Sequence, residues 1–193
     1  MMKQNKKAHI VVDMLYDFIE GSMACHNSHN AVDKSIEFIN SNPEQLLFYI
    51  TDSHPASHCS FKENGGIWPA HCVKGTKGEK IDEKFYNLVN NKSQRPSEAN
   101  TLKKGEEPSL EQYSGFEALT SSGQTLESVL KEKSNGEIYV SGIATEYCIN
   151  ATVEDLKNAG FKVNLIEDAL AYVDYNGHKK TLKKLKESGV NII

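Results

Sequence analysis

The chain of 193 residues lacks any apolar run long enough to cross a membrane. Its longest apolar runs, IVV and LLFYI, have the length of a β-strand, whereas a transmembrane helix needs about 20 mostly apolar residues. The basic start, MMKQNKK, leads into AHIVVDM, which has neither the apolar core nor the small-residue cleavage site of a signal peptide. We therefore expect a cytoplasmic protein without a membrane partner.

Charge of one sign does not gather anywhere in the sequence. The 22 basic and 26 acidic residues are spread along the chain and give a formal net charge of -4. Nucleic acids and anionic membranes attract concentrated Lys and Arg, and no single-sign patch stands out here. The charge pattern therefore predicts neither nucleic acid nor anionic lipid as a partner.

The cysteines show no CxxC pair and no zinc-finger spacing. In a chain of this length we expect the four of them to be free thiols in a reducing compartment. They are Cys25, Cys59, Cys72 and Cys148.

The sequence also lacks a Pro/Gly/Ser-rich linker, an internal repeat and a low-complexity segment. We therefore expect one domain over residues 1–193, with residues 1–7 as a flexible tail. Whether copies of the chain form a homo-oligomer is left open.

Short β-rich runs alternate with stretches of helical periodicity. The predicted strands cover residues 8–14, 46–52, 99–104, 137–143, 161–168 and 190–193, and the predicted helices cover 29–41, 124–133, 145–160 and 176–189. This alternation predicts an α/β fold with a mostly parallel sheet of about six strands between two helical layers. The exception is 53–98, an irregular segment whose length favours a functional role.

Reactive side chains stand at the ends of four predicted strands. The first run leads to Asp13, the second ends at Asp52, the third ends at Lys104, and the fourth leads to Cys148. Each alone is explained by a turn, a solvated surface or packing. Open parallel sheets bind ligands at the carboxyl ends of their strands, so the four together predict a site at one edge.

The stretch SGIATEYCIN places Cys148 near the start of a predicted helix. With Thr145 as the N-cap, Cys148 is the third helical residue, and the positive end of the helix dipole favours its thiolate. Glu146 acts in the opposite direction. Since free cysteine is often buried, this stretch alone leaves a nucleophile and a packing residue as alternatives.

A metal site is predicted from TDSHPASHCSF and WPAHCVKGT. Asp52 and His54 are two apart on extended chain, so their side chains face the same way, and His71 adds a second imidazole. This set suits zinc, iron or manganese, with His58 as an optional fourth ligand. A polar loop without metal is the alternative, and a structural zinc site using Cys59 and Cys72 ranks lower.

These residues, taken together, resemble the nicotinamidases of the isochorismatase-like cysteine hydrolases. The resemblance runs from about residue 8 to the C-terminus and rests on five segments in the family's order: IVVDMLYDF, TDSHPASHCSF, WPAHCVKGT, KKGEEPSLEQYSGF and SGIATEYCINATVEDLKNAG. One departure is the loop DMLYDFIEGSMACHNS, where many relatives carry a glutamine and a double glycine.

The resemblance implies a role for each matching residue. The catalytic aspartate, lysine and nucleophile fall on Asp13, Lys104 and Cys148. The backbone amides of Ala144 and Cys148 match the oxyanion hole, with a cis peptide before Ala144. The implied metal ligands are Asp52, His54 and His71, with His58 open, and the aromatic residues around the substrate ring are Phe18, Trp68 and Tyr113.

The implied activity is hydrolysis of nicotinamide to nicotinate and ammonia through a thioester, in NAD salvage. One divalent ion, with zinc preferred over iron or manganese, is the implied cofactor. The alternatives are a relative that acts on another amide, a carbamoyl compound or a vinyl ether, and a catalytically silent metal-binding member.

The remaining polar residues that drew attention have simpler explanations. We expect Asp168 to be an N-cap or a loop anchor. His9, His26, His29 and His178 are expected to be surface or core histidines.

Overall fold

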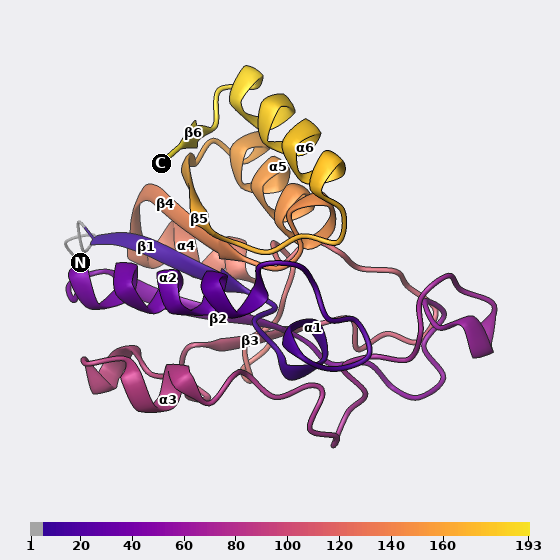
Figure 1. Cartoon of the computed structure of the whole chain (residues 1–193). Helices are drawn as coiled ribbons and strands as arrows, with labels where there is room; N and C mark the ends of the chain where they lie inside the picture. Colours follow the sequence, from indigo (N-terminus) through magenta and orange to yellow (C-terminus); the bar gives the residue numbers. More distant parts are fainter. Residues whose placement is uncertain (1–5) are drawn as a thin grey trace.

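The computed structural model describes residues 6–193, which form a three-layer α/β/α fold around a six-stranded, all-parallel sheet (Figure 1). The strand order is β3-β2-β1-β4-β5-β6. The strands are β1 (Lys6–Val12), β2 (Leu46–Asp52), β3 (Thr101–Lys104), β4 (Ser134–Gly142), β5 (Lys162–Leu170) and β6 (Asn191–Ile192). The predicted fold class and all six predicted strands are therefore confirmed, with shifts of a few residues at the ends.

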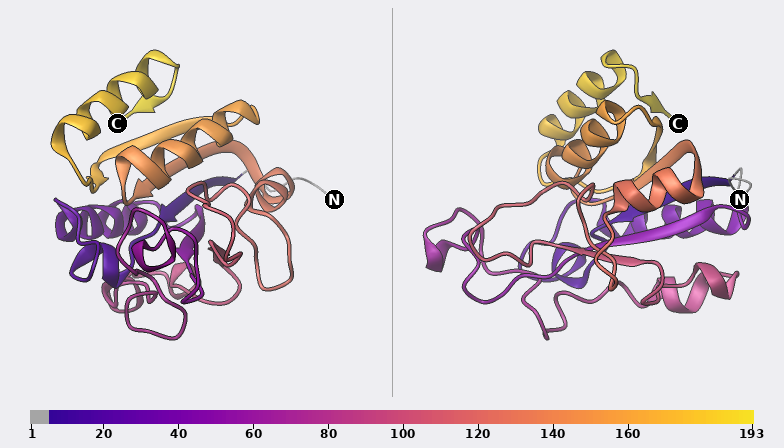
Figure 2. Two further views of the ribbon diagram at one scale, coloured as in Figure 1. Left: turned by 90° about the vertical axis from the view of Figure 1, so that its right-hand side faces the viewer. Right: turned by 180° about the vertical axis from the view of Figure 1, so that it is seen from behind.

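Helices cover both faces of the sheet, as Figures 1 and 2 show. One apolar core lies between the sheet and α1 (Tyr16–Ile19), α2 (Ser28–Ser41) and α3 (Lys84–Leu88). The second lies between the sheet and α4 (Leu126–Lys133), α5 (Asn150–Asn158) and α6 (Tyr175–Glu187). The strands are buried on both sides, which explains their near-continuous apolar runs.

Two local expectations are wrong. Strand β1 begins at Lys6 and pairs with β4, so residues 6–7 do not belong to a tail; residues 1–5 lie outside the described part. The segment 53–98 is irregular, as expected, apart from α3 and two short 3₁₀ turns, Lys62–Asn64 and Lys92–Gln94. Asp168 is neither an N-cap nor a loop residue, because β5 extends to Leu170.

The order of the strands creates a switch point between β1 and β4. From β1 the chain adds β2 and β3 on one side, and β4, β5 and β6 on the other. Crossover connections diverge at such a point and leave a crevice beyond the carboxyl ends of the strands. Asp13 follows β1 and Cys148 follows β4, so they flank this crevice.

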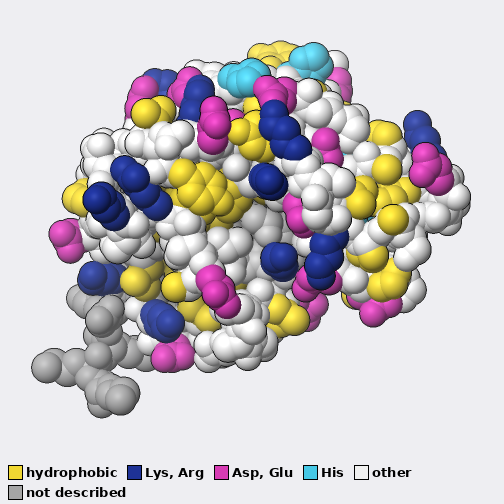
Figure 3. Space-filling view, turned by 90° about the horizontal axis from the view of Figure 1, so that it is seen from below, with side chains coloured by type: hydrophobic (Ala, Val, Ile, Leu, Met, Phe, Trp, Pro, Cys, Tyr) yellow, Lys and Arg dark blue, Asp and Glu magenta, His cyan; other side chains and the backbone are white. Residues whose placement is uncertain are grey.

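The face of the molecule shown in Figure 3 carries no large patch of one charge sign. In Figure 3, lysine and arginine side chains are interspersed with aspartate and glutamate. Among the described residues, no helix is long and apolar enough to span a bilayer.

Candidate active site

The four strand-end residues converge in one buried cluster. The Nζ atom of Lys104 lies 2.9 Å from Oδ2 of Asp13 and 3.6 Å from Sγ of Cys148. It also donates a hydrogen bond to Oδ1 of Asp52. A carboxylate oxygen of Asp13, a carboxylate oxygen of Asp52 and the Cys148 sulfur all lie within 4.8 Å of one another. The common direction of the parallel strands brings these residues to one edge, as the sequence predicts.

Lys104 holds two carboxylates in a region without solvent. Burial lowers the pKa of Lys104, but Asp13 and Asp52 outweigh it and hold that pKa well above its ordinary value. Burial alone would raise the pKa of Asp52, yet Lys104 and His54 hold it below its usual range. Lys104 is therefore an ammonium and Asp52 a carboxylate at neutral pH.

Burial shifts the pKa values of Asp13 and Cys148 in the same direction. Burial, followed by the charge of Asp52, raises the pKa of Asp13 to about 7. Burial raises the pKa of the Cys148 thiol well above its ordinary value, although Lys104 opposes the shift. The resting sulfur is therefore a thiol that lies within 4.8 Å of the Asp13 carboxylate, and the helix terminus does not overcome burial. A carboxyl that titrates near neutral pH suits a general base.

The segment carrying Cys148 differs from the predicted helix start. The Ile143–Ala144 peptide is cis, as the resemblance implies. Residues Thr145–Ile149 form a π-helical turn ahead of α5, and Ala144, not Thr145, is the N-cap. Thr145 does not cap the helix because its hydroxyl and its N–H both donate to the carbonyl of Ala171. Cys148 is thus the fourth residue of the turn.

Asp52 also belongs to a second group, in which three side chains bring metal-binding atoms close together. Atoms of Asp52, His54 and His71 lie within 4.8 Å of one another. His54 donates its Nδ1–H to the carbonyl of Gly105 at 2.8 Å, and His71 donates its Nδ1–H to that of Pro69 at 2.8 Å. In the neutral rings both Nε2 atoms therefore carry a lone pair, as in histidines that bind metals, and Nε2 of His54 lies 3.5 Å from Oδ2 of Asp52.

Gly105 is needed for this arrangement. Its φ of +72° lies in the left-handed region, and a Cβ there would lie 2.3 Å from Cε1 of His54. Any larger residue would push His54 away from the carbonyl that orients it.

His58 does not join the three ligands. Its Nδ1 accepts a hydrogen bond from the N–H of Ser60 at 3.3 Å, and its Nε2 donates to the carbonyl of Leu110 at 3.1 Å. Its ring packs against that of His54, with centroids 4.1 Å apart. Both nitrogens are engaged, so His58 braces the site.

An aromatic pocket opens above Cys148 and Asp52. The three aromatic residues named from the sequence, Phe18, Trp68 and Tyr113, line it. Trp68 donates its Nε1–H to the Tyr113 hydroxyl at 3.0 Å. Most of the residues that line the pocket are apolar or aromatic, which suits a flat ring.

Tyr147 is a pocket residue that the sequence analysis missed. Its ring packs edge-on against Trp68, with centroids 5.1 Å apart, and lies 5.7 Å from that of Tyr113. Its position directly before Cys148 is the signal that could have found it.

Asp17 is a second missed residue. Its carboxylate accepts hydrogen bonds from the N–H groups of Cys72, at 2.7 Å, and Ser22, at 3.3 Å. Asp17 therefore ties α1, which carries the pocket residue Phe18, to the loop that carries His71. A carboxylate one residue before Phe18 gave no periodic or spacing signal for this contact.

Known proteins share this architecture along nearly the whole chain. The Isochorismatase domain model matches residues 7–193. A nicotinamidase of Escherichia coli is 30% identical over 182 residues, which cover 84% of this chain and 81% of that protein.

Two solved structures extend the comparison. Pyrazinamidase of Pyrococcus horikoshii in complex with zinc superposes with a TM-score of 0.83 at 34% identity, over 97% of this chain and 98% of that one. PnC1 of L. infantum in complex with nicotinate has a TM-score of 0.79 at 28% identity, over 98% of this chain and 92% of that one. The chain therefore belongs to the isochorismatase family of hydrolases and is of the nicotinamidase type.

Proposed function

We propose that the protein is a metal-dependent cysteine amidohydrolase that converts nicotinamide to nicotinate and ammonia. The observation that carries the proposal is the junction of Asp13, Lys104 and Cys148 beneath an aromatic pocket whose wall holds Asp52 and His71. The pocket suits a flat heteroaromatic ring, and the buried thiol suits attack on a carboxamide attached to it.

Acyl transfer begins with a proton transfer. Asp13 takes the proton of the Cys148 thiol as the sulfur attacks the carboxamide carbon. The developing oxyanion is bound by the backbone N–H groups of Ala144 and Cys148; one donor of this kind is worth about 3 to 4 kcal/mol in other acyl-transfer enzymes. Protonated Asp13 then gives its proton to the departing amine, which leaves as ammonia.

In the second half of the reaction, Asp13 acts as the base toward water instead of toward the thiol. Asp13 deprotonates a water molecule that attacks the thioester carbon, the C–S bond breaks, and nicotinate leaves. The proton returns to the Cys148 sulfur. Throughout, the Lys104 ammonium keeps Asp13 and Cys148 aligned and offsets the negative charge that moves between them.

Asp52, His54 and His71 would hold one divalent ion. Two imidazoles and a carboxylate leave coordination positions for ligands other than protein, and zinc, iron and manganese all accept this set. A bound ion would supply Lewis acidity toward the pyridine nitrogen and so help orient the ring. The zinc-bound Pyrococcus horikoshii relative supports zinc as the first ion to test.

The test is ammonia release from nicotinamide, with nicotinate quantified in parallel. The expected result is turnover by the zinc-loaded protein and none by Cys148→Ala. Cys59→Ala is the matched control, because Cys59 is another free thiol and does not line the pocket. No release from nicotinamide at micromolar enzyme would reject the proposal.

A panel of other substrates separates the alternatives. Release from pyrazinamide but not benzamide would support recognition of the ring nitrogen. Turnover of an aliphatic amide, a carbamoyl compound or a vinyl ether in preference to nicotinamide would assign the chain a different reaction. A silent member would show no turnover and no enhanced alkylation of Cys148.

A further inference from the structure

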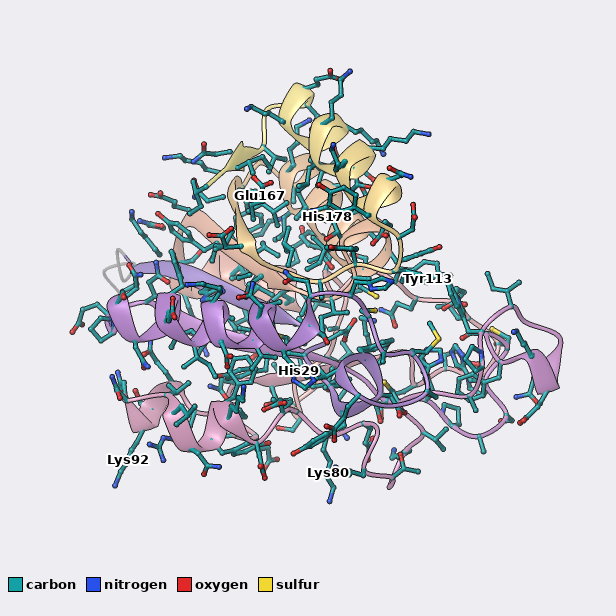
Figure 4. The ribbon with its side chains drawn as sticks, viewed as in Figure 1. His29, Lys80, Lys92, Tyr113, Glu167 and His178 are labelled. Carbon is teal, nitrogen blue, oxygen red and sulfur yellow. The ribbon has the colours of Figure 1, made fainter. Side chains whose placement is uncertain are left out.

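We propose that His178 is a positioning residue for the nucleophile turn, the segment Thr145–Ile149 that carries Cys148, and that it acts through Thr145. The proposal rests on the proposed cysteine hydrolase function. His178 lies in the first turn of α6 (Figure 4) and is not among the residues that line the aromatic pocket. It lies 33 residues from Thr145 along the chain and contacts it directly.

The hydrogen bonds of Thr145 assign the direction of the contact. Thr145 is completely buried, and its hydroxyl donates to the Ala171 carbonyl at 3.0 Å. That hydroxyl has one proton, so toward His178 it acts as an acceptor. The Nδ1 atom of His178 lies 2.9 Å away and must therefore carry the proton that it donates.

The His178 ring is held in place from several sides. Its backbone N–H donates to the carbonyl of Asp174, the N-cap of α6. Its ring packs against Tyr172, with centroids 4.6 Å apart, and against Tyr175 at 6.4 Å. Only 7% of His178 is exposed. A ring so confined presents Nδ1–H to Thr145 at a constant position.

A second contact fastens the same two segments. The Glu146 carboxylate accepts hydrogen bonds from the N–H groups of Val173, at 3.3 Å, and Asp174, at 2.7 Å. Residues 171–174 are therefore bound to the nucleophile turn at both Thr145 and Glu146. Since these two lie between Ala144 and Cys148, a shift of the turn displaces both proposed oxyanion donors and the sulfur.

The role requires a donor at Nδ1 and does not depend on a positive charge. Burial lowers the pKa of His178, while Glu146 and Glu167 act weakly in the opposite direction, so the neutral ring predominates at pH 7. An asparagine side chain places an amide N–H close to the position of histidine Nδ1 and does not titrate. Asparagine should therefore restore what alanine removes.

The experiment compares His178→Ala, His178→Asn and Thr145→Val in the zinc-loaded protein. His178→Ala should lower kcat for nicotinamide about tenfold, the value of one buried hydrogen bond. KM should change less than about twofold, because the aromatic pocket is untouched. His178→Asn should recover kcat to within about threefold. His29→Asn, at an exposed histidine on α2, is the matched control and should change neither constant.

The double variant His178→Ala/Thr145→Val tests the route. If His178 acts through Thr145, the kcat of the double variant should be no lower than that of the more impaired single variant. Multiplicative losses would overturn the proposal. So would an unchanged kcat in His178→Ala with a lower melting temperature, which would make His178 a packing residue only.

Iodoacetamide separates this inference from the proposed function, since alkylation of Cys148 needs no substrate. Cys148 should react more slowly in His178→Ala than in the wild type and recover in His178→Asn. A wild type inactive on nicotinamide but showing this pattern would reject the proposed substrate and keep the role of His178. Equal alkylation rates in all variants would reject the role.

Discussion

The Nζ atom of Lys104 lies 2.9 Å from Oδ2 of Asp13, with both side chains fully excluded from solvent. The two residues come from strands that are not neighbours, because β2 lies between β3 and β1. Lys104 spans the end of β2 and contacts Asp52 on the way. It therefore connects the proposed general base to the proposed metal ligand, and its single positive charge faces two carboxyl groups.

Asp13 should control how the reactivity of Cys148 depends on pH. Its carboxylate is the proposed proton acceptor, and its pKa is raised to about 7, so the alkylation rate and kcat/KM should both rise as pH increases through about 7. Asp13→Asn cannot accept the proton and should lower kcat/KM at least about 100-fold. Rates measured from pH 5 to 9 check this.

Asp168→Asn is the control for that series, because Asp168 is an exposed carboxylate on β5 outside the cluster. It should keep the wild-type profile. A pH profile that is the same in the wild type and Asp13→Asn would show that another group is the base.

His54 and His58 should differ in their effect on metal binding. His54→Gln removes a proposed ligand whose Nε2 faces the metal-binding group, so zinc affinity should fall at least about tenfold. His58→Gln removes a ring whose two nitrogens are both bound to the backbone, so one equivalent of zinc should still bind. Chelator competition, with metal content measured by emission spectroscopy, distinguishes the two.

Removal of the metal completes this test. Dialysis against a chelator should abolish turnover of nicotinamide, and added zinc should restore it. Full activity of the metal-free protein would reject the metal requirement. If His58→Gln no longer bound one equivalent of zinc, His58 would have to be counted as a metal ligand.

The aromatic pocket should act mainly on substrate binding. Tyr147→Leu removes the ring that packs edge-on against Trp68, and Trp68→Leu removes its partner. Each should raise KM about two- to tenfold, the usual value of an aromatic pair. Steady-state kinetics with nicotinamide check this.

Tyr86→Leu is the control, because Tyr86 is an exposed tyrosine on α3 outside this pocket. Its KM should match that of the wild type. Unchanged KM values in both pocket variants would place the substrate elsewhere.

His9 should contribute to acid unfolding. It is completely buried, its Nε2 lies 2.9 Å from the Ser141 hydroxyl, and burial lowers its pKa to about 3. An unfolded histidine titrates near 6.5, so the unfolded state binds the extra proton between these values. Stability is present above pH 6.5 and is lost as pH falls, by up to about 1.4 kcal/mol per pH unit.

Urea denaturation at pH 7, 6 and 5 measures this contribution. His9→Gln keeps a polar group near Ser141 and does not titrate, so its stability should fall less steeply below pH 6.5 than that of the wild type. His26→Gln, at an exposed histidine, should follow the wild type. Parallel curves for the wild type and His9→Gln would exclude His9 as the cause.

Local pattern alone was enough to predict the layers and the edge that holds the site. Apolar runs locate the strands, because a strand buried on both faces has apolar residues at nearly every position. Helical periodicity locates the helices, because a helix buried on one face has apolar residues at every third or fourth position. The ends of parallel strands meet at one edge, so Asp13, Asp52, Lys104 and Cys148 could be grouped without knowing the strand order. The assignment of roles to them came from the resemblance of five segments.

What the sequence by itself determined was thus the class of fold, the edge and the candidate chemistry. Only the tertiary structure decided that both nitrogens of His58 are engaged, that Tyr147 enters the pocket, and that Thr145 contacts His178 rather than capping a helix. These outcomes depend on hydrogen bonds and packing between segments that are distant in the chain. Residue order carries no periodic mark of such contacts, because they form only when the crossovers and loops have brought the segments together.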